Sequence, residues 1–264
     1  MRRSAPLTNC LLAALIAAGA SFAQAPNKGA SKGLAPKSAA EGQAVNAVIQ
    51  AQMPDDVIKA VDALLTKFAD TVFKSFALEL EAEAYQQKGD NAKAIVYGEQ
   101  ALQVDPKNYE AENLLANVLS ATTRDTDLDK EEKLARAEKY AHDALDILQT
   151  GVRPALYANG TDEAWAKRKA AAESLSWQAL GTAALVRKKT DDAIADFQKG
   201  VDAFPDPLLV IRLGRALYAA KKYDDAIGWD QKVMDSADAP AQYKSIAQAD
   251  RARAMQAKGQ PAAK

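Results

Sequence analysis

The chain has 264 residues, of which 48% are hydrophobic and 26% are charged, and its formal net charge at pH 7 is −1. This composition is that of a globular protein and excludes a disordered or collagen-like chain. The near-neutral charge also argues against non-specific binding of nucleic acid. Glycine (13) and proline (10) are scarce and alanine is abundant, so we expect helix throughout.

The first 23 residues are typical of a secretory signal. Arg2 and Arg3 precede an apolar run at residues 11–20, and Ser21-Phe22-Ala23 provides small residues for cleavage. Cleavage there would remove Cys10, the one cysteine. The apolar run is shorter than the roughly 20 residues that span a bilayer, so an uncleaved membrane anchor is the less favoured alternative. We therefore expect an exported, periplasmic protein with no stable membrane insertion after cleavage.

The rest of the chain divides into a linker and a series of helix pairs. Residues 24–37 are rich in Pro, Gly, Lys and Ser and predict a flexible linker. From Ser38 onward, apolar residues recur at spacings of three and four, which predicts amphipathic helices in consecutive pairs. The expected pairs are 38–71, 75–108, 109–149, 161–206 and 207–240, followed by a capping helix at 241–258 and a tail at 259–264.

Two of these pairs depart from the common length. The third has a long turn at residues 122–130, and a Gly- and Pro-containing insertion at 150–160 precedes the fourth. The first helix of the fourth pair then extends from Thr161 to Arg187, about 27 residues or roughly 40 Å. We expect both insertions to form surface loops.

The clearest pair lies between Ser174 and Pro205. Its order, Trp177-x2-Leu180-Gly181 followed by Ala193, Phe197 and Pro205, resembles the tetratricopeptide repeat (TPR), whose period is about 34 residues. The resemblance implies an all-α fold, a right-handed α-solenoid of TPR helical hairpins closed by the C-terminal capping helix. Small residues such as Gly181 are expected where two helices cross closely, and large ones such as Phe197 between hairpins.

The inventory of reactive side chains argues against an enzyme. After signal cleavage the chain has one histidine, His142, and no cysteine, so no nucleophile–base pair can be proposed. Asp125, Asp127 and Asp129 have the spacing of the start of an EF-hand loop, but Lys130 and Arg136 stand where that loop needs Gly and Glu. We therefore expect no metal and no cofactor, and interpret the aspartates as an acidic start to the following helix.

Two further features leave alternatives open. Asn159-Gly160-Thr161 matches the glycosylation pattern, although a loop turn is the preferred interpretation. Trp165 falls beside the 150–160 insertion, where it either packs the insertion down, which we favour, or forms an exposed contact.

The TPR resemblance implies a concave groove lined by the first helix of each hairpin. Its amide side chains could bind the backbone of a partner segment whatever the partner's sequence. The residues at the groove-facing offsets are Asn46, Glu79, Glu83, Gln86, Asn113, Asn117, Gln178, Thr182, Ile211, Arg215 and Tyr218. Glu79 stands where carboxylate-clamping TPRs have a basic residue, which argues against a carboxylate clamp.

These observations predict a non-enzymatic scaffold or adaptor of the bacterial cell envelope that holds a protein segment in the groove. The alternative is a periplasmic TPR protein that binds a small molecule or glycan near Trp165 and the 150–160 insertion. A pocket under that insertion would favour the alternative, and an open polar groove would favour the scaffold. The partner and the oligomeric state do not follow from the sequence.

Overall fold

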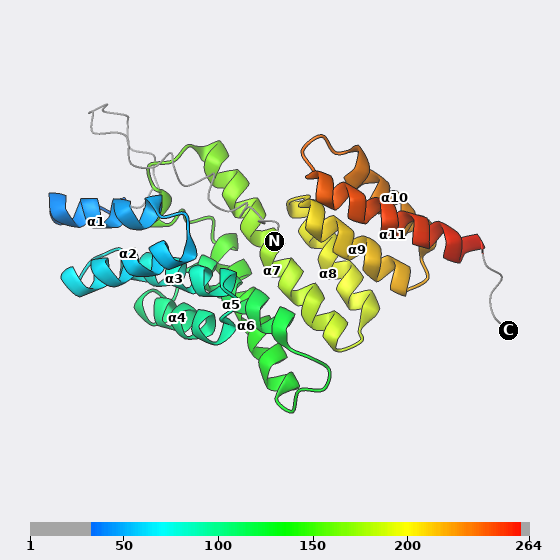
Figure 1. Ribbon diagram of the computed structural model, residues 1–264, viewed down its shortest axis with the longest axis horizontal. Helices are drawn as coiled ribbons and strands as arrows, with labels where there is room; N and C mark the ends of the chain where they lie inside the picture. The colour runs from blue at the N-terminus through cyan, green and yellow to red at the C-terminus, as the bar shows by residue number, and fades with distance from the viewer. Residues whose placement is uncertain (1–32, 260–264) are drawn as a thin grey trace. The chain divides into compact units, whose positions relative to one another are not determined.

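The computed structural model describes residues 33–259, and within them all regular structure is helical. Figure 1 labels the helices in chain order. Their bounds are α1 (Ala39–Gln50), α2 (Pro54–Lys67), α3 (Lys74–Gln87), α4 (Asn91–Val104), α5 (Tyr109–Thr122), α6 (Lys130–Gln149), α7 (Asp162–Val186), α8 (Thr190–Ala203), α9 (Pro207–Ala219), α10 (Tyr223–Asp235) and α11 (Ala241–Gly259). A 3₁₀ turn, η2 (Ala155–Tyr157), lies in the insertion before α7.

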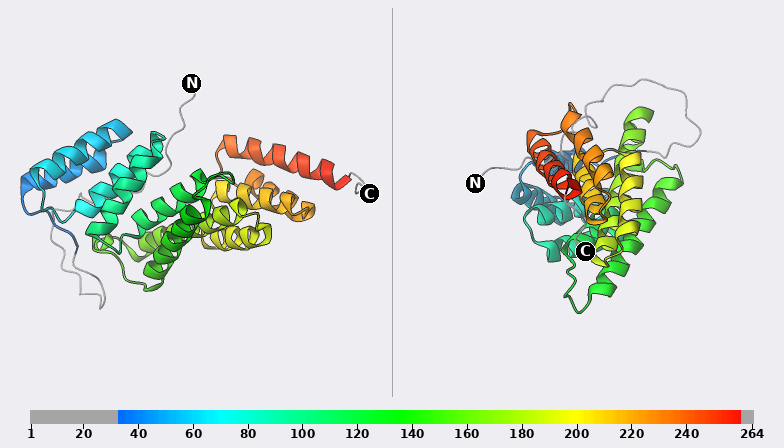
Figure 2. Two further views of the ribbon diagram at one scale, coloured as in Figure 1. Left: turned by 90° about the horizontal axis from the view of Figure 1, so that it is seen from below. Right: turned by 90° about the vertical axis from the view of Figure 1, so that its right-hand side faces the viewer.

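The described helices form two compact units. Unit 1 holds the chain up to Val118 together with Asp146–Arg168, and unit 2 holds Leu119–Leu145 and the chain from Lys169. Within unit 1, α1, α2, α3 and α4 pack in sequence, each against the next. Within unit 2, α8 packs on α9, α9 on α10, and α11 on both α10 and α9 (Figure 2). This order of neighbours is that of a TPR-type α-solenoid, so the expected fold class is confirmed.

Local capping chemistry fixes where several helices begin. The Ser38 hydroxyl accepts a hydrogen bond from the Glu41 amide at the start of α1, and Asp90 accepts one from the Lys93 amide at the start of α4. Asp206 accepts from the amides of Leu208 and Leu209, and Pro207 occupies the first position of α9. These side chains replace the hydrogen bonds that a helix N-terminus lacks.

The turn inside three hairpins has one geometry. Gly89, Lys188 and Lys221 each lie two residues after a first helix and have positive φ angles of 78°, 62° and 60°. In each turn the next amide donates back to a carbonyl five residues earlier, for example Lys222 to Leu217. This is the Schellman closure, which requires a left-handed residue. Two of the three hairpins therefore place lysine where glycine is favoured.

Each unit has its own apolar core. In unit 1, α1, α2 and α3 meet around a cluster of buried aliphatic and aromatic side chains, namely Val45, Val48, Val61, Leu64, Phe73 and Phe76. In unit 2, α8 to α11 enclose a second cluster that includes Phe197, Leu209, Ile211, Leu213 and Ala247. Because one hairpin has too little apolar surface to fold alone, these shared clusters hold consecutive hairpins together.

The end of the predicted linker is bound to unit 1. The Leu34 amide donates to the Ala155 carbonyl at 3.3 Å, and the Leu34 side chain packs on the core around Val48. The Lys37 ammonium pairs with Asp70 at 2.6 Å. Residues 33–37 thus differ from the expected flexible linker, because one leucine suffices to bury part of the segment. The predicted signal and the rest of the linker lie outside the described residues.

No helix in residues 33–259 is both long enough and apolar enough to cross a membrane.

Candidate functional site

The predicted groove residues all lie on first helices of hairpins. In unit 1 they are Asn46 on α1; Glu79, Glu83 and Gln86 on α3; and Asn113 and Asn117 on α5. In unit 2 they are Gln178 and Thr182 on α7, and Ile211, Arg215 and Tyr218 on α9. Their use by a partner stays a prediction, and their accessibility differs from residue to residue.

Three of these residues offer almost no surface, which corrects the expectation that they face a groove. Glu79 and Asn113 are each 3% exposed and Ile211 is 1% exposed. Ile211 belongs to the core of unit 2, together with buried residues of α8, α10 and α11. Glu79 is buried among Glu83, Glu110 and Arg168, so its carboxyl faces other side chains of unit 1.

The remaining eight retain some surface. Gln86 and Arg215 are exposed, whereas Asn46, Glu83, Asn117, Gln178, Thr182 and Tyr218 are half-buried. Some of their polar atoms are bound to their own helix: Asn117 Nδ2 donates to the Asn113 carbonyl at 2.9 Å, and Thr182 Oγ1 to the Gln178 carbonyl at 2.7 Å. A partner at these positions would therefore compete with helix hydrogen bonds.

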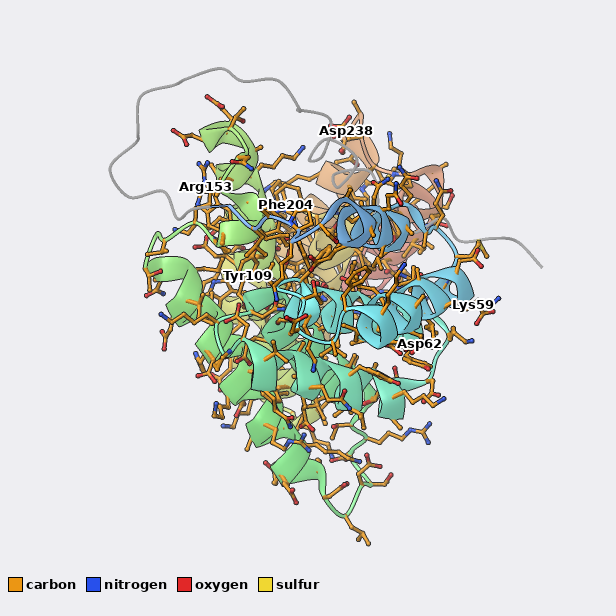
Figure 3. The ribbon with its side chains drawn as sticks, turned by 90° about the vertical axis from the view of Figure 1, so that its left-hand side faces the viewer. Lys59, Asp62, Tyr109, Arg153, Phe204 and Asp238 are labelled. Carbon is orange, nitrogen blue, oxygen red and sulfur yellow. The ribbon has the colours of Figure 1, made fainter. Side chains whose placement is uncertain are left out.

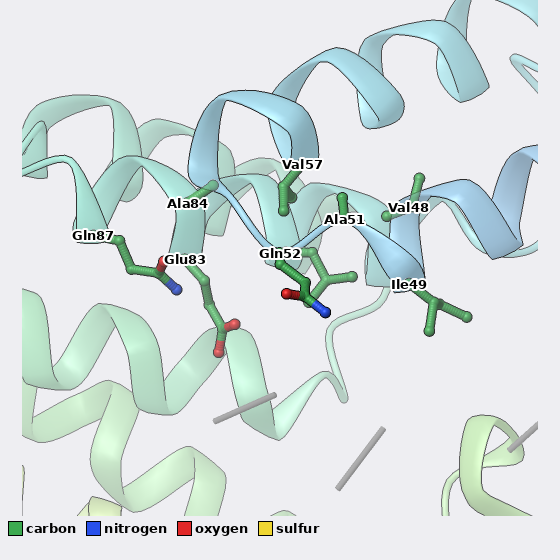
Figure 4. Close-up of a pocket in the computed structure, with 9 residues that line it drawn as sticks. Val48, Ile49, Ala51, Gln52, Val57, Glu83, Ala84 and Gln87 are labelled. Carbon is green, nitrogen blue, oxygen red and sulfur yellow. The ribbon is translucent and has the colours of Figure 1, made fainter. Parts of the chain in front are cut away.

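A pocket in unit 1 lies between consecutive first helices. Its apolar wall comes from α1, α2 and α3, and its polar lining consists of Gln52, Glu83 and Gln87. In Figure 4 these three side chains extend to one side, away from Val57 and Ala84. The full lining is Val48, Ile49, Ala51, Gln52, Val57, Leu80, Glu83, Ala84 and Gln87. Figure 3 places Lys59 and Asp62, two exposed residues, on the outer side of α2.

The family offsets predicted only Glu83 among these lining residues. Gln87 follows Glu83 by one helical turn, so the spacing of four could have identified it. Gln52 lies in the short connection between α1 and α2, where an offset carried over from first helices gives no signal. The pocket therefore includes polar groups from a helix and from a loop.

Three carboxylates and one guanidinium meet beside this pocket. The carboxyls of Glu79 and Glu83 interact with each other, and the Glu110 carboxylate acts on both. Burial, the adjacent Glu83 and Glu110 raise the pKa of Glu79 well above its usual range. Burial and Glu110 raise the pKa of Glu83 to about 7. Arg168 opposes these effects, but its Nη1 is already 2.8 Å from Glu110.

The 150–160 insertion is packed down by aromatic residues. The Trp165 ring stacks on Tyr157 with centroids 6.1 Å apart and meets the edge of Tyr109 at 6.2 Å. Tyr157 is buried, and its hydroxyl donates to Glu110 at 2.6 Å, while Arg168 lies over its ring. The favoured interpretation of Trp165 as a packing residue is thus confirmed, and the space beneath the insertion holds these side chains.

The aspartates that resemble the start of an EF-hand loop are paired with lysines of the same unit. Asp125 pairs with Lys130 and Lys188, and Asp127 and Asp129 pair with Lys133. Within residues 33–259 no three His, Cys, Asp or Glu side chains are placed to share a metal ion. His142 is exposed on α6, and Asn159 lies in the turn that follows η2.

In unit 2 a second group of charges lies where α9, α10 and α11 meet. Asp230 on α10 is 1% exposed, and its Oδ1 has no hydrogen-bond partner among the described residues. Burial and the nearby Asp250 raise its pKa to about 7, against the effect of Arg215 and Arg251. Arg215 Nε instead donates to Asp250 at 2.6 Å. Arg215, predicted for the groove, therefore links α9 to α11.

Part of the chain is similar to a known repeat family. Residues 179–242 match the tetratricopeptide repeat family. No curated protein matches the sequence.

Several solved structures are similar to the chain. A thermophilic TPR protein of Thermus thermophilus has a TM-score of 0.53 at 15% identity, covering 80% of this chain and 98% of its own. MamA of Desulfovibrio magneticus has a TM-score of 0.40 at 17% identity, with 74% and 90% covered. PilF of Pseudomonas aeruginosa has a TM-score of 0.28 at 21% identity, with 69% and 88% covered.

The repeat match and the first of these structures support a TPR protein. TPR proteins in general mediate protein–protein interactions. At 15% identity the likeness to the Thermus protein concerns the fold alone.

Proposed function

We propose that this protein is an exported adaptor of the bacterial envelope that holds a segment of a partner protein against the first helices of its hairpins. The observation that carries the proposal is the unit 1 pocket between α1 and α3, with an apolar wall and amide groups at Gln52 and Gln87. Amides can pair with a backbone of any sequence, and the apolar wall beside this hollow of about 20 Å³ offers a contact for one side chain of the partner.

The N-terminal sequence supports the envelope location. Arg2 and Arg3, the apolar run at residues 11–20 and the small residues before Gln24 are the three parts of a secretory signal. N-terminal sequencing of the protein recovered from the cell envelope tests this part. A mature chain that begins at Gln24 would support export, and an intact Met1 in the cytoplasmic fraction would contradict it.

Site-specific crosslinking tests the binding face. A photo-reactive amino acid replaces Gln87 in the full chain expressed in cells, and a matched variant carries it at Asp62, exposed on the outer side of α2. We expect a defined protein adduct from position 87 and none from position 62, with the crosslinked segment identified by mass spectrometry. The identified segment, made as a peptide, should bind the purified chain, and Gln52→Arg should weaken it. Equal adducts from both positions would contradict the proposed face.

A further inference from the structure

The pocket of unit 1 combines an apolar wall with a carboxyl group. Val48, Ile49, Val57 and Leu80 give it an apolar wall, and Glu83 brings a carboxyl to the same space. An aliphatic stem fits against such a wall, whereas the carboxyl requires a polar or charged group at the end of that stem.

The charges around Glu83 favour a cation at that end. Glu79, Glu83 and Glu110 interact with one another, and Arg168 is the cation that acts on all three. Arg168 Nη1 donates to Glu110 Oε1 at 2.8 Å and also lies 3.2 Å from the Tyr157 hydroxyl. Arg168 is thus bound to Glu110 and the Tyr157 hydroxyl, while Glu79 and Glu83 form no ion pair with a cation among residues 33–259 and interact with each other.

A further positive charge would favour the ionised form of Glu83 over its protonated form. Burial disfavours the ionised form of Glu83, and the Glu110 carboxylate adds repulsion, which is why its pKa rises to about 7. An incoming carboxylate would add to the repulsion, and an incoming apolar group would exclude water from Glu83 without pairing it. An ammonium or guanidinium would instead compensate the excess charge and donate hydrogen bonds to Glu83 and to the amide oxygens of Gln52 and Gln87.

We propose that a lysine or arginine side chain of the partner segment lies across this hollow of about 20 Å³, with its methylenes against the apolar wall and its charged end at Glu83. This inference rests on the proposed function, since it names the anchoring residue of the segment held there. It also separates this site from TPR sites that clamp a carboxylate, because the pocket carboxyl is Glu83 and the neighbouring Glu79 stands where those sites have a base.

Selection of peptides on the full chain tests the inference. Random twelve-residue peptides displayed on phage are selected against the immobilised wild type, against Glu83→Gln, and against Asp62→Asn as the matched control on the outer side of α2. We expect Lys or Arg to be enriched at one fixed position on the wild type and on Asp62→Asn, and the enrichment to disappear on Glu83→Gln. Gln87→Trp, which fills the pocket, should block the selected peptides.

A synthetic peptide distinguishes the contribution of the ammonium group to binding from that of the methylenes. Replacing the enriched lysine by norleucine keeps the methylenes and removes the ammonium, and should weaken binding to the wild type at least about tenfold. The same replacement should leave binding to Glu83→Gln nearly unchanged. Circular dichroism melts would show that Glu83→Gln is folded, as expected for a change that removes one of three adjacent carboxylates.

The outcomes distinguish the two proposals. Peptides that are blocked by Gln87→Trp but show no basic residue, or bind Glu83→Gln equally well, would overturn the basic anchor and leave the binding face standing. Peptides that Gln87→Trp does not block, or a selection that yields none, would count against both.

Discussion

The ring of Phe197 on α8 lies directly against Gly181 on α7, so a Cβ at position 181 would lie 2.5 Å from Cδ1 and Cε1 of that ring. Phe197 is fully buried, so the ring cannot swing into solvent to make room. Gly181→Ala should therefore force the two helices apart and lower the free energy of unfolding by about 1–3 kcal/mol. Urea unfolding followed by circular dichroism measures this loss.

Gly228 provides the matched control. It lies inside α10, where a Cβ would have no neighbouring atom within 4 Å, so an added methyl group meets open space. Gly228→Ala should stabilise the protein by up to about 1 kcal/mol, since alanine is the better helix former. If Gly181→Ala were as stable as Gly228→Ala, the close packing of α7 on α8 would be contradicted.

The sequence predicted a close helix crossing at Gly181, because such a crossing depends on residue size at a repeated spacing. It placed Phe197 between hairpins, however, rather than against Gly181 in the same hairpin. Gly181, Phe197 and the helix-starting Pro54 follow local rules of size and backbone geometry that any hairpin of this type obeys. The burial of Glu79 did not follow, because it depends on Glu110 and Arg168, which approach from α5 and α7. An offset along one helix carries no information about charges on other helices.

Offsets along one helix also could not predict the whole lining of the pocket. Glu83 lies on a helix and could be placed by its offset, whereas Gln52 reaches the pocket from a connection whose path depends on how α1 meets α2. The burial of Asp230 likewise depends on other helices, because α11 packs on α10. Gly214 on α9 leaves room for the Asp230 carboxyl, since a Cβ at position 214 would lie 3.0 Å from Oδ1.

Asp230 should make stability depend on pH. Its pKa in the folded protein is about 7, above its ordinary value of about 4, so the folded state binds the proton more tightly than the unfolded state. The stability contributed by Asp230 is therefore present below about pH 4 and is lost as the pH rises towards about 7. Asp230→Asn cannot ionise, so it should exceed the wild type in stability at pH 8 by about 1–3 kcal/mol.

Thermal unfolding of both proteins between pH 5 and pH 8 measures this difference, which should shrink as the pH falls. Asp225→Asn, an exposed position on the same helix, is the control and should show no such trend. A variant Asp230→Asn that is less stable than the wild type at pH 8 would mean that attraction to Arg215 and Arg251 outweighs burial.

Lys221 should be a site where glycine stabilises. Its φ of 60° places it in the left-handed region, which lysine adopts only at a cost, and Gly89 already occupies the same position in the turn between α3 and α4. Lys221→Gly should raise the free energy of unfolding by about 0.5–1 kcal/mol. The adjacent Lys222→Gly is the control. Lys222 has an ordinary φ of −83° and pairs with Asp191, so glycine there relieves no strain, removes the ion pair and should lower the free energy of unfolding. Chemical denaturation would refute the strain at Lys221 if both variants lost stability.

Tyr157 should control how firmly the insertion is held to unit 1. Its hydroxyl donates to Glu110, whose carboxylate also accepts from Arg168, so Tyr157→Phe removes one charge-assisted hydrogen bond and keeps the ring against Trp165. We expect local opening of the insertion to become easier by about 1.5–3 kcal/mol. Hydrogen exchange of the Leu34 amide, which donates to the Ala155 carbonyl, reports this opening and should accelerate at least about tenfold. Tyr218→Phe on α9, in unit 2, serves as the control and should leave that amide unchanged. Unchanged exchange at Leu34 in Tyr157→Phe would show that the Tyr157 hydroxyl does not help to hold the insertion in place.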